Sequence, residues 1–91
     1  TPGAYNFELK VIGYTTTGPA ATGFTILGTM RTSGAAATLV GTPDETVIED
    51  VSMLTSDVDM VASGNNLIIR STGVVGLTID WNVVATYVFV S

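Results

Sequence analysis

The chain has no histidine and no cysteine. Without histidine it lacks the commonest general base of enzymes, the hydrolase triads and most zinc sites. Without cysteine it can form neither a disulfide nor a thiolate metal site. Nucleophilic catalysis would then depend on serine, threonine, lysine or a carboxylate. The sequence therefore predicts a protein that is not an enzyme, uses no cofactor and holds no tightly bound transition metal.

Basic residues are scarce as well. Three basic and eight acidic residues give a net charge of −5, and charged residues are 12% of the chain, about half the usual share. Binding to nucleic acid or to an anionic membrane surface requires Lys and Arg, so we expect neither partner. No apolar run reaches the roughly 18 residues of a membrane span. A polar but uncharged surface is typical of structural proteins that pack beside copies of themselves.

A chain of 91 residues is enough for one small domain and too short for two. We expect residues 1–91 to form a single β-sandwich domain. The sequence begins at Thr1 rather than Met, so we expect either a processed product or a piece of a longer protein.

Alternation of side chains with a period of two, the spacing of a β-strand, is the dominant pattern. No helical window of useful length appears. Turn signals recur about every eight to twelve residues, which favours an all-β fold, a single antiparallel β-sandwich or jelly roll of seven to eight strands. The predicted strands include residues 5–11, 23–32, 36–42, 45–51, 57–62, 67–71 and 77–90.

Two short features within this pattern carry local predictions. Residues 63–66 (SGNN) are the strongest turn signal and should close a hairpin between the strands on either side. Gly28 interrupts its strand, which indicates a bulge or a close backbone approach.

The last predicted strand, residues 77–90, alternates over the longest stretch. One face carries the only Trp, a Tyr and a Phe, so we expect this face to pack a core. We predict that Trp81 is buried against Phe7 or Phe24, because a large aromatic residue dominates a core this small.

The opposite face of this strand begins polar and ends apolar at Val84, Thr86, Val88 and Val90. A strand that faces water should be polar on that side. We therefore expect these four residues to form an interface between copies of the chain. The alternative is that the other sheet or a loop of the same chain covers them.

Two residue groups could bind small ligands. Asp57 and Asp59 lie on one face of a predicted strand and could bind Ca²⁺ together with backbone carbonyls, although a plain solvent-facing side is the commoner outcome. Trp81 or Tyr14 could stack against a sugar ring, although a core role suits Trp81 better.

The second half of the chain also resembles a known class of modules. The segments TLVGT (residues 38–42), ASGNNLIIR (62–70) and TGVVGLTIDW (72–81) are similar to β-rich modules at the ends of tailed-bacteriophage virion proteins, such as tail-fibre and head-surface proteins. The likeness covers roughly residues 24–91. It departs at Leu77, where a Lys is common, and in the apolar tail from Val83 to Val90.

The resemblance implies a virion structural role and no enzymatic one. We therefore expect a fibre, decoration or receptor-binding module at the surface of the virion, which acts through protein–protein contacts with other virion proteins and with copies of itself. A trimer is favoured over a dimer, because the resemblance is to fibre-like virion proteins, and it implies that arrangement. The alternative is a carbohydrate-binding module with an aromatic platform and the Asp57/Asp59 calcium site, and a virion module could also bind a host glycan.

Overall fold

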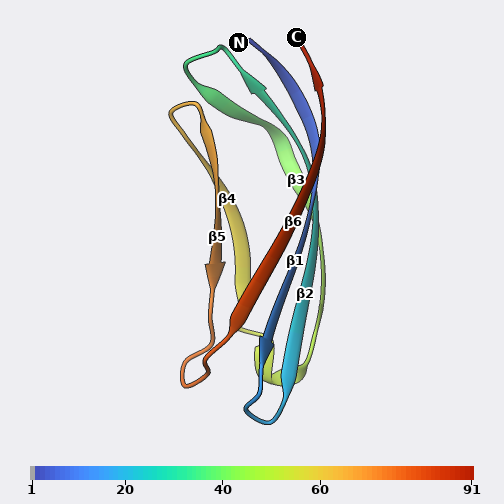
Figure 1. The fold of residues 1–91 in the computed structure, drawn as a ribbon, viewed down its shortest axis with the longest axis vertical. Coiled ribbons are helices and arrows are strands. Elements are labelled where there is room, and N and C mark those ends of the chain that lie inside the picture. Colours follow the sequence, from blue (N-terminus) through green and yellow to red (C-terminus); the bar gives the residue numbers. More distant parts are fainter. Residues whose placement is uncertain (1) are drawn as a thin grey trace.

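The computed structural model describes residues 2–91, which form two antiparallel β-sheets and one short 3₁₀ helix, η1. The first sheet has four strands in the order β3-β2-β1-β6, and the second is the hairpin β4-β5. The hairpin packs over one face of the larger sheet, called the inner face below (Figure 1). The elements are β1 (Gly3–Thr15), β2 (Ala20–Thr32), β3 (Ala37–Glu49), η1 (Val51–Met53), β4 (Asp57–Ser63), β5 (Asn66–Thr72) and β6 (Asp80–Val90).

The prediction of an all-β antiparallel fold is confirmed, but the prediction of seven to eight strands is wrong. Six strands form, because the two strands expected before and after Pro43 are one continuous strand, β3. The register between β2 and β3 shifts between Leu27 and Thr29, opposite Gly41–Pro43. Gly41 takes a φ of 68°, which costs glycine little. The supposed turn is therefore a bulge within a strand.

The predicted hairpin with its turn at residues 63–66 is confirmed, and it joins β4 and β5. Ser63 pairs with Asn66, so the turn residues are Gly64 and Asn65. Gly64 has a φ of 57°, a left-handed conformation typical of tight hairpin turns. The hairpin turn is tied to the larger sheet, because the backbone N–H of Ala37 donates to the Gly64 carbonyl at 2.7 Å.

The core lies where the hairpin crosses the inner faces of β1 and β2. Alternate residues of β1 and β2 point towards the hairpin, and Val58 of β4 meets them. The buried cluster consists of Phe7, Leu9, Val11, Phe24, Ile26 and Val58, with Met30, Leu39, Met60, Leu67 and Trp81 packed against it.

The 3₁₀ helix closes one end of the two layers, beside the β1–β2 turn (Figure 1). Met53 is fully buried there, and its carbonyl accepts a 2.6 Å hydrogen bond from the Ser56 hydroxyl. Asp50 also pairs with Ala21, whose N–H donates to the Asp50 carboxylate at 2.8 Å. Among residues 2–91, η1 is the sole helix, and nothing helical there has the length and apolar character to cross a membrane.

Two aromatic rings lie directly across glycines on neighbouring strands. Phe7 of β1 pairs with Gly28 of β2, and Trp81 of β6 pairs with Gly13 of β1. A Cβ atom at Gly28 would lie 2.5 Å from the Phe7 ring, and one at Gly13 would lie 2.8 Å from the Trp81 ring. The glycines therefore make room for the two rings, and the close approach expected at Gly28 is present.

The last strand is less buried than its sequence pattern predicts. Its inner face carries Trp81, Val83, Ala85, Tyr87 and Phe89. Trp81 is the most buried of them, Val83 and Phe89 are still 47% and 38% exposed, and none of the five is fully buried. Phe7 and Phe24 are buried, and Trp81 lies beside Phe24 with the ring centroids 6.4 Å apart. The cause is the two-stranded second layer, which covers too little of the sheet to bury β6 along its length.

We predict that Gly28→Ala destabilises the fold by about 1–3 kcal/mol, because the new methyl group overpacks against the Phe7 ring. The matched control is Gly23→Ala on the same strand, where a Cβ atom meets only the Ile48 carbonyl at 3.7 Å. This control should be neutral or stabilising. Urea unfolding of both variants measures the difference, and equal costs would show that Phe7 does not restrict Gly28.

We also predict that Phe24→Ala costs more stability than Trp81→Ala. Phe24 is fully enclosed, so its loss should cost about 3–5 kcal/mol. Trp81 is half-buried, so removing it should cost about 2 kcal/mol, roughly half the value for a fully buried Trp. Denaturant unfolding gives both values. A larger cost for Trp81→Ala would place Trp81, rather than Phe24, at the centre of the core.

Candidate interaction surface on the last strand

The outer face of β6 presents the four residues predicted as an interface. Val84, Val88 and Val90 are 58%, 69% and 69% exposed, and Thr86 lies between them. Neither the hairpin nor a loop covers them, since the hairpin lies over the inner face. Within residues 2–91, this apolar face is therefore open to solvent.

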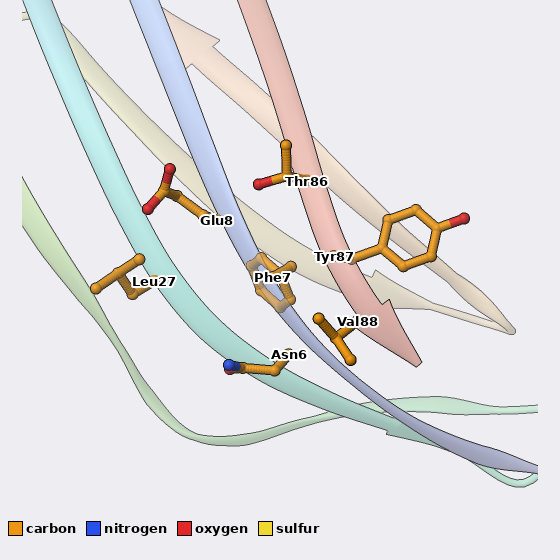
Figure 2. Close-up of a pocket in the computed structure, with 7 residues that line it drawn as sticks. All are labelled: Asn6, Phe7, Glu8, Leu27, Thr86, Tyr87 and Val88. Carbon is orange, nitrogen blue, oxygen red and sulfur yellow. The ribbon is translucent and has the colours of Figure 1, made fainter. Parts of the chain in front are cut away.

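A shallow depression of about 410 Å³ runs along this outer face over the backbone of β1. Figure 2 shows Leu27 of β2 on one side and Thr86 and Val88 of β6 on the other, with Asn6 and Glu8 between them. The Tyr87 ring points away from the depression, because it belongs to the inner face. Its lining has one carboxylate, Glu8, and otherwise apolar or uncharged side chains, so it offers mainly packing contacts.

The inner face of β6 carries an exposed aromatic cluster at its C-terminal end. The Tyr5 ring of β1 lies 5.5 Å from the Tyr87 ring and 4.6 Å from the Phe89 ring, measured between centroids. These are favourable aromatic distances. Tyr87 is nevertheless 66% exposed, so the cluster is available to a partner. Both faces of the strand are thus apolar and accessible.

A narrow slot separates β6 from the hairpin. It has a volume of about 140 Å³ and lies between Ile69 and Ser71 of β5 and Trp81 and Val83 of β6, with Val58 among its lining residues. The two layers therefore leave an apolar opening on the side where β5 and β6 are both edge strands.

The two carboxylates proposed for calcium share the outer side of the hairpin, as expected. Asp59, however, is already engaged: Arg70 donates to both of its carboxylate oxygens, at 2.9 and 2.7 Å. These hydrogen bonds, together with the charge of the guanidinium, lower the pKa of Asp59 below its usual range. No group of three or more acidic side chains within residues 2–91 is arranged to hold a metal ion. A calcium ion at Asp57 and Asp59 would have to compete with Arg70.

Glu45 of β3 lies near the same hairpin. Partial burial raises the pKa of the Glu45 carboxyl, and the negative charges of Asp57 and Asp59 raise it further. The hairpin is thus held against β3 in spite of some repulsion between carboxylates.

The two aromatic residues considered as alternative sugar platforms lie on opposite faces of the larger sheet. Trp81 lies on the inner face across from Gly13, whereas Tyr14, the next residue of β1, belongs to the outer face and pairs with Asp80. Trp81 also lines the slot, where its ring is only partly accessible. Tyr14, by contrast, is 46% exposed.

Sequence reasoning assigned the aromatic cluster to the core and did not consider Arg70. Tyr5, Tyr87 and Phe89 do share the inner face, but the sequence did not show that the second layer leaves Tyr87 and Phe89 exposed. The partner of Asp59 could have been found, because a turn at residues 63–66 places Arg70 directly opposite Asp59.

Comparisons of the chain with family models, with curated proteins and with solved structures found no match.

We predict that Glu45→Gln raises the free energy of unfolding at pH 7 by at most about 0.5 kcal/mol, the scale of changes at exposed sites. A carboxyl with a raised pKa destabilises the folded chain once the pH exceeds its unfolded value, about 4.3. The gain should therefore disappear as the pH falls below that value. Thermal melts at pH 7 and pH 3.5 test this. The control is Glu8→Gln, which removes a carboxylate 4.0 Å from Lys10 and should bring no gain.

Proposed function

We propose that this chain is a structural module of a phage-like virion, a fibre, decoration or receptor-binding domain that acts through protein–protein contacts at the particle surface. We take its two layers as a single β-sandwich domain with a minimal second sheet. The observation that carries the proposal is β6, an edge strand with exposed apolar side chains on both faces. Exposed apolar surface of this kind marks interaction sites.

Charge and shape support the same proposal. Low charge leaves little repulsion between neighbouring chains in an assembly. The molecule is elongated, 47 Å long and about 20 Å across, with the start of β1 and the end of β6 paired at the same end (Figure 1). A chain of this shape could project from a longer protein while its side remains free for contacts. The resemblance of residues 24–91 to virion modules points in the same direction.

Self-association is part of this proposal, and the partners are copies of the chain and other virion proteins. The trimer expected from the resemblance rests on that likeness alone, since no feature of residues 2–91 favours three copies over two.

A second candidate is a carbohydrate-binding module, and one observation favours it. Tyr87 and Phe89 are exposed and pack against the partly buried Tyr5 ring, and sugar rings stack on exposed aromatic faces. The calcium site of this alternative is weakened by the Asp59–Arg70 pair. Binding to a glycan array that is lost in Tyr87→Ala would support this second function.

Antibodies raised against the purified chain should label phage-like particles from the producing host in immunogold electron microscopy. Val88→Asp should reduce incorporation into particles at least tenfold, because a charge on this face would have to be buried in the contact. The matched control is Val40→Asp, because Val40 lies in the same cross-strand row as Val88, at the opposite edge of the sheet. Unlabelled particles, with the chain remaining in the soluble fraction, would refute the virion role.

A further inference from the structure

The two edges of the four-stranded sheet differ in how they are protected. Along β3, a bulge breaks the edge at Gly41–Pro43, and three carboxylates follow it at Asp44, Glu45 and Glu49. Bulges, prolines and charges are the usual devices that keep a sheet edge from pairing with another chain. β3 is thus a protected edge.

The opposite edge, β6, has none of these devices. Residues 80–90 contain no proline, no glycine and no basic residue, and the one charged side chain, Asp80, stands at the start of the strand. The ladder with β1 runs regularly from Ala4–Val90 to Tyr14–Asp80 without a bulge. Because β6 pairs with β1 on one side only, alternate backbone N–H and C=O groups on its other side point outward. Within residues 2–91, no strand pairs with them.

We propose that β6 pairs with β6 of a second copy of this chain, antiparallel and about a two-fold axis near Thr86, to form a continuous eight-stranded sheet. This inference rests on the self-association in the proposed function and specifies its contact. An isologous contact of this kind is the commonest route to a homodimer. Such a contact requires that each side chain of the strand packs well against the residue that the two-fold axis places opposite it in the second copy.

The sequence of β6 meets this requirement. With Thr86 opposite Thr86, the outer face would place Val84 opposite Val88. The inner face would place Val83 opposite Phe89 and Ala85 opposite Tyr87. Pairs of aromatic and β-branched or small apolar residues stabilise neighbouring strands, and like charges directly opposite one another destabilise them. In this register no charged residue faces another charged residue.

The distribution of charge also favours a second copy. Six of the eight acidic residues lie between residues 44 and 59, on or beside β3 and β4: Asp44, Glu45, Glu49, Asp50, Asp57 and Asp59. Two copies joined at β6 keep these regions at opposite ends of the joined sheet. Most of the net charge of −5 on each chain would then lie far from the contact and be screened by salt.

The size of the contact predicts a weak dimer. In this register nine residues of β6, Asn82 to Val90, face the second copy. They span about 31 Å, and one sheet is about 10 Å thick, so each copy contributes about 300 Å². The total lies below the roughly 1,200 Å² at which stable interfaces begin. We therefore expect association that depends on concentration in the isolated chain and is strengthened where copies are held side by side.

The test measures mass against concentration by analytical ultracentrifugation from about 1 µM to 1 mM, the range of weak complexes. We expect the mass to rise from that of one chain, 9.4 kDa, towards twice that value. Thr86→Lys places two like charges at the two-fold axis and should weaken the dimer at least tenfold. The matched control is Thr46→Lys, the same change at an exposed outer-face position on β3, which should leave dimerisation unchanged.

Hydrogen exchange provides the second measurement. Alternate amides of β6 should become protected as the concentration rises, whereas those of β3 should not. A monomer throughout the range would overturn the pairing, as would a mass of three chains or an equal loss of association in both lysine variants. These outcomes concern the contact alone, because immunogold labelling of particles tests the virion role independently.

Discussion

The fold is governed by the difference in size between its two sheets. A sheet of four strands, three of them 13 residues long, is covered by a hairpin of two seven-residue strands. The hairpin can enclose only the middle of the inner face, where Phe24, Ile26 and Val58 meet. Everything beyond its reach, above all β6, remains exposed although its sequence is apolar. The surface features on which the proposals rest follow from this one constraint.

The small core that does form depends on close contact between rings and backbone. Phe7 and Trp81 lie across Gly28 and Gly13, so a glycine on each neighbouring strand replaces a side chain that would otherwise hold the ring away. Interstrand contacts of this kind increase packing where few residues are available to fill the interior. Two sheets of unequal size can therefore remain packed around a main cluster of six buried residues.

The exposed strand connects fold and function. An apolar edge without proline, bulge or lysine is unfavourable for a chain that functions alone. It suits a chain whose neighbours are copies of itself or other proteins of one particle. The two candidate functions use different parts of this strand. An assembly contact would use the outer valines and the edge, whereas sugar binding would use the inner aromatic cluster.

The sequence by itself determined the features that depend on neighbouring residues. The period of two determined the all-β class, residues 63–66 determined the hairpin and hence its register, and Gly28 marked a place of bulge or close approach. Tertiary structure decided the rest. Whether Pro43 ends a strand or sits in a bulge depends on whether β2 runs past it as a partner. Whether Tyr87 and Phe89 are buried depends on how far the hairpin extends over β6. Both outcomes are set by contacts between segments far apart in the chain, and alternation along one strand shows only which side chains share a face, not whether another layer covers that face.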